Sequence, residues 1–321
     1  MHGLSSLRLD TEETELKIAA VVVTFNRLNL LKQCVNSIRG QTRRLDAVIV
    51  INNSSTDGTL DWLNSQTDLI CITQENTGSA GGQYTGIRFA YDRGYDWIWC
   101  MDDDTLPNEN CLDKLMTIGV DEEPDAGFFC STVLFTDGSI CIGNQPLLRN
   151  HSGSRLLDEG KTSSAVDEPR IEVVAATFVS ILLNRTIIAE VGFPRGDFFI
   201  RYDDVEYTRR ISSTGRKCFW VPSSVAVHFI ERNMEYSFAK STREDQGKYY
   251  YGLRNAMFTR LYLTRLPFWR IPIRALSILI GTTTDLWKMG RAKALKPFHV
   301  LTYCRAYIDA VLRRTGMRKR I

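Results

Sequence analysis

The stretch Asp96-Trp-Ile-Trp-Cys-Met-Asp-Asp-Asp-Thr105 decides the fold, because an apolar run leads directly into three adjacent carboxylates. An apolar run bounded by turn residues is typical of a buried strand, and Pro107 indicates that the chain turns soon afterwards. Three neighbouring acids at the end of a buried strand repel one another unless a positive charge lies beside them. Mg²⁺ and Mn²⁺ prefer carboxylate oxygens, so we predict a divalent-cation site here. The alternative is a solvated acidic turn.

The residues before this stretch alternate between short apolar runs and segments with helical spacing. Strands are predicted at residues 17–24, 47–51 and 70–72, and each is followed by a polar turn and a helix. This order predicts an α/β fold with a parallel sheet, in which ligands bind at the carboxyl ends of the strands. The polar turns therefore meet the acids in one crevice.

The second half of the chain is less regular. Strands are predicted at residues 126–135 and 171–183, and the polar, charged segment 144–170 between them is predicted to be a loop. From residue 244 onward, the spacing of the apolar residues is typical of helices.

The composition is that of a globular protein, with 44% hydrophobic and 24% charged residues. The eight cysteines are scattered without a CxxC pair, which favours reduced thiols over disulfides or a zinc site. Residues 1–17 are polar and acidic, without the apolar core of a secretory signal, and no run is long enough to span a membrane. We therefore expect a cytoplasmic protein with a loose N-terminal arm.

The net charge of +3 conceals an asymmetry along the chain. From Arg260 onward there are fourteen basic and two acidic residues, a local charge of +12 that leaves −9 for the rest. Basic amphipathic helices with Trp and Leu lie on anionic membrane surfaces, whereas a helical subdomain packed on the body is the alternative. No nucleic-acid-binding motif accompanies the charge, so nucleic acid is not an expected partner.

Several polar positions are candidates for binding a nucleotide diphosphate beside the metal. The stretch Asn76-Thr-Gly-Ser-Ala-Gly81-Gly82 could bring backbone amides to a phosphate at a helix N-terminus, although a tight turn is the alternative. Singly, polar residues at strand ends are ordinary turn residues. Placed together in one crevice, four of them favour hydrogen bonding to a nucleobase: Thr24, Asn26, Arg27 and Asn53.

Asp203 and Asp204 follow an apolar run and open a predicted helix. Acids in the first turn of a helix are usually structural, because they interact with the helix dipole. Two adjacent acids also raise each other's pKa, which suits a general base. His228 follows Val-Ala-Val at a strand end, where a structural role and a metal-ligand role both remain open.

In their order, these motifs resemble the family 2 glycosyltransferases, which are inverting enzymes of the GT-A fold. The stretch Phe-Ile-Arg-Tyr-Asp203-Asp204-Val-Glu206-Tyr is most similar to bacterial galactofuranosyltransferases, with rhamnosyltransferases next. The resemblance covers residues 18–255 and implies a Rossmann-like, mostly parallel sheet flanked by helices. Residues 1–17 would then form the arm and residues 256–321 a basic, mostly helical C-terminal extension. The other matching pieces are Val-Val-Val-Thr24-Phe-Asn26-Arg27, Ile-Asn52-Asn53-Ser-Ser-Thr-Asp57-Gly58, Asn76-Thr-Gly78-Ser-Ala-Gly81-Gly82, Met-Asp102-Asp103-Asp104 and His228.

The resemblance implies roles for the acids and the histidine. Asp102, Asp104 and His228 would hold Mn²⁺ or Mg²⁺. Asp204 would be the catalytic base, and Asp203 would hold the acceptor or tune its neighbour.

The resemblance also implies a donor site. Many relatives have an aspartate at the position of Asn53, and an amide can pair with uracil or thymine alike, so both nucleotides remain open. The implied contacts are Thr24, Asn26, Arg27 and Asn53 to the uridine, Asp103 to the sugar, and Asn76, Gly81 and Gly82 to the diphosphate and sugar.

We therefore expect metal-dependent, inverting transfer of galactofuranose from UDP-galactofuranose to a hydroxyl of a glycan or lipid-linked glycan in bacterial cell-surface polysaccharide synthesis. The alternatives are a rhamnosyltransferase using dTDP-rhamnose, a non-catalytic nucleotide-sugar or lipid-binding protein, and a nucleotidyltransferase. Expected partners are the nucleotide sugar, the acceptor and an anionic membrane surface at the inner face of the cytoplasmic membrane. A homo-oligomer is left open.

Overall fold

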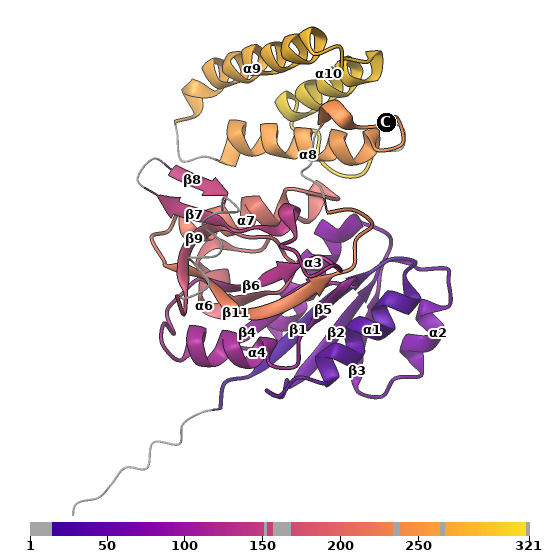
Figure 1. Ribbon diagram of the computed structural model, residues 1–321, viewed down its shortest axis with the longest axis vertical. Helices are drawn as coiled ribbons and strands as arrows, with labels where there is room; N and C mark the ends of the chain where they lie inside the picture. The colour runs from indigo at the N-terminus through magenta and orange to yellow at the C-terminus, as the bar shows by residue number, and fades with distance from the viewer. Residues whose placement is uncertain (1–14, 151–152, 157–167, 234–237, 264–266, 319–321) are drawn as a thin grey trace, which may run out of the picture.

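The structure is a computed structural model that describes residues 15–150, 153–156, 168–233, 238–263 and 267–318. A large α/β body carries a smaller group of helices at one end of its long axis (Figure 1). Residues 1–14 of the predicted arm lie outside the described residues.

The first half of the chain alternates strand and helix, as predicted. Strands β1, β2, β3 and β4 pair in parallel, in the order β3-β2-β1-β4. Parallel pairing places the polar turns that follow these strands at one edge of the sheet. The elements are β1 (Ile18–Thr24), α1 (Leu28–Arg39), β2 (Ala47–Asn52), α2 (Thr59–Asn64), β3 (Leu69–Thr73), α3 (Gly78–Asp92) and β4 (Trp97–Asp102).

The second half of the body extends the same sheet. The described strands form one sheet of 11 strands, in which β10 is antiparallel to β4 and β6, and β6 is parallel to β11. Strands β1, β2, β3, β4, β6 and β11 therefore share one direction, which confirms the mostly parallel central sheet. The elements are β5 (Thr105–Pro107), α4 (Cys111–Lys114), β6 (Phe128–Leu134), β7 (Leu147–Asn150), β8 (Gly153–Leu156), β9 (Ile171–Ala175), β10 (Ile181–Asn184), α6 (Arg185–Val191), α7 (Asp203–Ser212) and β11 (Cys218–His228).

The prediction of a loop over residues 144–170 is wrong in part. Strands β7 and β8 form an antiparallel hairpin within it, and β7 pairs with β9. A hairpin at the edge of a sheet does not need the continuous apolar run of a buried strand, so its sequence lacks the pattern on which the prediction depended. Residues 157–167 lie outside the described part of the chain.

Successive residues of β1 face opposite sides of the sheet and enter two separate cores. Ile18, Ala20 and Val22 pack in the core beneath α1 and α4, while Val21 and Val23 pack in the core beneath α3 and α7. Helices cover both faces, which explains why the strands are nearly continuous apolar runs.

The C-terminal part is helical, as predicted, and packs around a third core, which also includes Ala80 and Phe198 of the body. Helix α8 contributes Tyr250 and Phe258 to this core, α9 contributes Ile278, and α10 contributes Tyr303 and Ala306. The predicted domain boundary after residue 255 falls inside α8, so we place the helical group from α8 onward. No helix in the described residues is long and apolar enough to cross a bilayer. The helices are α8 (Gln246–Phe258), α9 (Ile271–Arg291) and α10 (Pro297–Val311).

Candidate active site

Strands β4, β5 and β11 bring Asp102, Asp104 and His228 together. Asp102 ends β4, Asp104 lies in the turn before β5, and His228 ends β11. Thr105 of β5 pairs with His228 across an antiparallel ladder, and the N–H of Phe229 donates to the Asp104 carbonyl at 2.8 Å. The ladder therefore fixes the imidazole opposite the carboxylates, although 124 residues separate Asp104 from His228.

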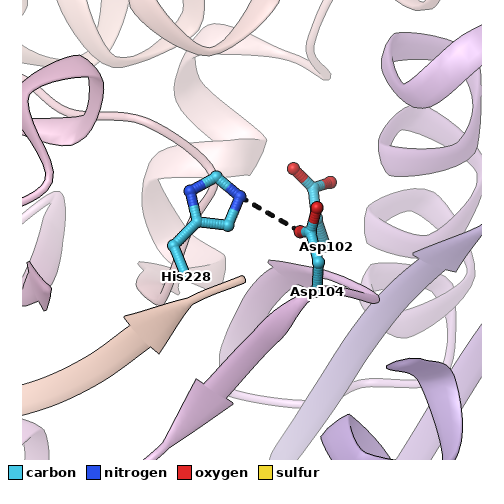
Figure 2. Close-up of side chains that lie close together, drawn as sticks. All are labelled: Asp102, Asp104 and His228. Carbon is cyan, nitrogen blue, oxygen red and sulfur yellow. Dashed lines mark hydrogen bonds and ion pairs between the residues drawn. The ribbon is translucent and has the colours of Figure 1, made fainter. Parts of the chain in front are cut away.

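The three side chains point toward one another (Figure 2). One ligand atom from each lies within 4.8 Å of the others, and Nε2 of His228 is 3.1 Å from Oδ1 of Asp104. Two carboxylates and an imidazole are a donor set that suits Mn²⁺, and carboxylates alone also suit Mg²⁺. These residues therefore fit a divalent cation.

Arg27 and Thr24 contact the same acids. Nη1 of Arg27 is 2.5 Å from Oδ2 of Asp104 and 3.3 Å from Oδ1 of Asp103, and the Thr24 hydroxyl donates to Oδ2 of Asp103 at 2.7 Å. Both oxygens of Asp103 are thus engaged by residues at the end of β1, and the side chain is buried. The structure places all three residues in the site, and their contacts to uridine and sugar stay predictions.

The cluster has an excess of negative charge that attracts a cation. Burial and the charge of Asp104 raise the pKa of Asp102 to about 7. Burial lowers the pKa of His228, but its hydrogen bond to Asp104 is among the contacts that outweigh burial and raise this pKa to about 10. In the protein alone, a proton on His228 and the Arg27 guanidinium offset the carboxylates. A divalent cation would compete with both.

Asn144 orients the imidazole and was not identified from the sequence. Its Oδ1 lies 2.9 Å from Nδ1 of His228, and its Nδ2 donates to the Thr177 hydroxyl at 2.9 Å. Because Asn144 offers its oxygen to the ring, Nδ1 keeps a proton whether the imidazole is neutral or protonated, and Nε2 faces Asp104. Such outer contacts fix the tautomer of metal-binding histidines. No periodic signal marks an amide in a polar loop, so sequence reasoning had no means of finding it.

We expect Asn144→Ala to weaken Mn²⁺ binding about 10- to 100-fold, because the imidazole loses the partner that fixes its tautomer. Calorimetric titration of Mn²⁺ measures the effect, and added Mn²⁺ should restore activity. Asn233→Ala is the matched control, since Asn233 holds the same loop through Ile140 and Ile142 without touching His228. Equal Mn²⁺ affinity in both variants would contradict the role of Asn144.

The amides predicted to bind the donor lie at the same edge of the sheet. Asn53 accepts from Gln74 at 2.8 Å and donates to the Gly78 carbonyl at 3.1 Å, while Asn76 accepts from the Gly78 N–H at 2.9 Å. Asn26 joins the turns after β1 and β2 through the N–H of Thr56. These side chains tie the loops of the crevice together, and their contacts to a base stay predictions.

The predicted diphosphate-binding glycines allow close packing of α3. A Cβ at Gly82 would lie 2.4 Å from Cγ1 of Val23 in β1, and a Cβ at Gly81 would lie 2.2 Å from Oγ1 of Thr77. A side chain at Gly82 would force α3 away from β1, and one at Gly81 would collide with the Thr77 side chain at the start of the same helix. The two glycines therefore have a structural role, and their contact with a diphosphate stays a prediction.

Asp203 and Asp204 are the first residues of α7. Burial, followed by the charge of Asp204, holds the pKa of Asp203 well above its usual range, and the charge of Asp102 raises it further. Burial also raises the pKa of Asp204 to about 6, although its Oδ1 accepts the Val205 N–H at 2.6 Å. A pKa of about 6 at Asp204 suits a general base that works close to neutral pH.

A strained loop precedes this pair and is held by α8. Phe199, Arg201 and Tyr202 all have positive φ angles of 66–69°. Asn255 donates to the carbonyls of residues 198, 200 and 201, at 3.1, 3.1 and 2.7 Å. Arg254 donates to the carbonyl of residue 198 at 2.9 Å, and both α8 side chains are buried. The sequence indicated only a helix at these two residues.

Family comparisons agree with this site. The chain matches "Glycosyl transferase family 2" over residues 19–151 and "Glycosyl transferase family group 2" over residues 97–306. The chain belongs to glycosyltransferase family 2. The two matches together include the cluster of Asp102, Asp104 and His228 and the pair at the start of α7.

Two relatives within the family are galactofuranosyltransferases. Galactofuranosyltransferase GlfT1 of Mycolicibacterium smegmatis is 27% identical over 208 residues, which are 62% of this chain and 66% of the relative. The protein of the same name from Mycobacterium tuberculosis is 28% identical over 203 residues, 62% of this chain and 65% of the relative. The match thus spans just under two thirds of each relative's length.

Solved structures show the GT-A fold. S. aureus TarS 1-349 in complex with UDP-GlcNAc superposes with a TM-score of 0.57 at 13% identity, over 92% of this chain and 82% of that one. GalNAc-T7 with UDP, GalNAc and Mn²⁺ superposes with a TM-score of 0.56 at 12% identity, over 94% of this chain and 55% of that one. At this identity the likeness concerns the fold alone.

Proposed function

We propose that this protein transfers galactofuranose from UDP-galactofuranose to a hydroxyl of a glycan or lipid-linked glycan in bacterial cell-surface polysaccharide synthesis. The observation that carries the proposal is the convergence of Asp102, Asp104 and His228 within 4.8 Å. Membership of family 2 supports sugar transfer, and the similarity to two galactofuranosyltransferases supports the sugar.

In this proposal Asp102, Asp104 and His228 hold Mn²⁺ or Mg²⁺. A bound divalent cation would offset the negative charge that develops on the leaving nucleoside diphosphate. Asp204 takes the proton of the acceptor hydroxyl, whose oxygen attacks the anomeric carbon from the face opposite the diphosphate. This in-line displacement inverts the anomeric configuration, and Asp203 holds the acceptor or tunes Asp204.

The proposed donor site is the edge formed by the turns after β1, β2 and β3. Thr24, Asn26, Arg27 and Asn53 lie there and would contact uridine. We also propose that the protein works at the inner face of the cytoplasmic membrane, where a lipid-linked acceptor is reached from the cytoplasm. The basic helical region supports this location, because anionic lipids attract clustered Lys and Arg.

Incubation with UDP-galactofuranose, Mn²⁺ and a lipid-tailed acceptor should release UDP and add one hexose, detected by mass spectrometry and linkage analysis. Removal of Mn²⁺ with EDTA should abolish the product, and added Mn²⁺ should restore it. A parallel reaction with dTDP-rhamnose in place of UDP-galactofuranose is the control for donor choice. Preferred turnover of dTDP-rhamnose would assign the chain to the rhamnosyltransferases, and release of pyrophosphate would indicate nucleotidyl transfer.

A further inference from the structure

The outward side of α9 is an exposed apolar stripe. Residues at helical spacing on its inner side, Ile278 and Met289 among them, are buried, and Ile278 lies in the core shared with α8 and α10. On the other side of the helix, opposite these buried residues, lies a second set of positions spaced three, four and seven residues apart, which therefore share one face. Four of these outward positions are apolar and more than half exposed, Ile273 (64%), Leu276 (58%), Ile280 (58%) and Trp287 (60%), while exposed Thr283 and Thr284 lie between the last two.

The turn before α9 extends this surface. Phe268 and Trp269 of the 3-10 turn Phe268–Arg270 are 82% and 57% exposed. Figure 1 shows α9 at one end of the molecule, with α8 between it and the sheet. Most of the exposed large hydrophobic side chains in the described residues lie in this helical group. Soluble surfaces rarely gather apolar side chains in this way unless they meet a partner or a membrane.

Cations flank the stripe at both ends. The Arg270 guanidinium lies 4.9 Å from the ring of Trp269, and that of Arg291 lies 4.9 Å from the ring of Trp287. Lys288 adds a third exposed cation, whereas Asp285 is the one acidic residue of α9. The surface therefore combines apolar side chains in the middle with aromatic rings and positive charges at its ends.

We propose that this face of α9 docks on an anionic lipid bilayer, with the helix lying in the plane of the surface. Indole rings prefer the headgroup level, the aliphatic side chains enter the acyl region, and the cations bind lipid phosphates. A second copy of the chain is a poorer occupant. A two-fold contact through this face would bring like cations together with only Asp285 to offset them, and such contacts are costly.

This docking links the bilayer to the acid pair. Helix α9 shares its core with α8, and α8 holds the loop before Asp203 through Arg254 and Asn255. The helix proposed to meet the lipid therefore shares a hydrophobic core with the helix that supports the proposed catalytic loop. For a lipid-linked acceptor, which rests on the proposed function, this connection would bring the hydroxyl to the site from the membrane side.

Cosedimentation with vesicles tests the docking. The full chain should sediment with phosphatidylcholine vesicles that contain phosphatidylglycerol and remain in solution with phosphatidylcholine alone. Replacing Ile280 and Trp287 with serine should lower the partition coefficient at least about tenfold, because their apolar area no longer enters the bilayer. In a second variant, Arg270→Gln with Arg291→Gln should lower binding to the anionic vesicles and flatten its dependence on salt.

Leu60→Ser is the matched control, because Leu60 is an exposed apolar residue of α2 in the body and should leave vesicle binding unchanged. Equal binding of wild type and both α9 variants would overturn the proposal. So would a wild-type dimer that the Ile280 and Trp287 variant converts to a monomer, since the face would then belong to a second copy. Transfer to a short water-soluble acceptor should be equal in wild type and α9 variants. If none of them transfers sugar while the wild type still binds the anionic vesicles, the result counts against the proposed function alone.

Discussion

Asp204→Asn should lower kcat about 10²- to 10⁴-fold and leave the Kd for UDP within about twofold of wild type. An amide oxygen still accepts the N–H of Val205, which Asp204 accepts at 2.6 Å, so the start of α7 should stay intact. The amide cannot take a proton from an acceptor hydroxyl. Turnover measured with UDP-galactofuranose and calorimetric titration of UDP with Mn²⁺ separate these two effects.

Two further variants of α7 sharpen this result. Glu206→Gln removes a carboxylate from the same helical turn, but Glu206 pairs with Arg210 at 2.9 Å and should leave kcat within about twofold. Asp203→Asn should cost less than Asp204→Asn if Asp203 only tunes its neighbour. A larger loss at Asp203 would assign the base to Asp203, whose pKa responds to the charge of Asp102. Weakened UDP binding with normal turnover in Asp204→Asn would refute both assignments.

The sequence predicts those parts of the fold that local patterns encode. Strands β1 to β4 are short apolar runs, and the first three are each followed by turn residues and helical spacing, so both their type and their order follow from the sequence. Asp102 and Asp104 can be identified in the same way, because they directly follow such an apolar run. Only the resemblance of the chain to a family connects His228 to these acids, since nothing local to Val-Ala-Val-His indicates which strand lies beside it.

The parts that the sequence does not predict depend on distant polar contacts. Asn144 lies 84 residues from His228, and Asn255 lies 54 residues from the carbonyl of Arg201. A single amide that forms a hydrogen bond with a distant group produces no periodic pattern and no compositional bias in the sequence. The hairpin of β7 and β8 at the end of the sheet is missed for a related reason, because pairing there is compatible with a polar sequence.

Asn255→Leu should lower kcat about 10²-fold while the KM for the donor stays near the wild-type value, because misplacement of a catalytic group acts on turnover. Positive φ angles at non-glycine residues cost about 1–3 kcal/mol each and persist only where neighbours hold them. Asn255 supplies such a hold, since its Nδ2 lies within 3.1 Å of three carbonyls in the loop. Leucine fills a similar volume without a donor, so the loop should relax and move Asp203 and Asp204.

The same substitution leaves buried carbonyls without partners and should also lower the free energy of unfolding by about 1–3 kcal/mol. Asn184→Leu is therefore the decisive control. Asn184 is buried as well and donates to the carbonyls of Pro124 and Ala126 at 3.0 and 3.1 Å, far from the loop. Both variants should lose similar stability in urea denaturation, yet only Asn255→Leu should lose turnover. Equal turnover in the two variants would show that α8 supports the fold without positioning the acid pair.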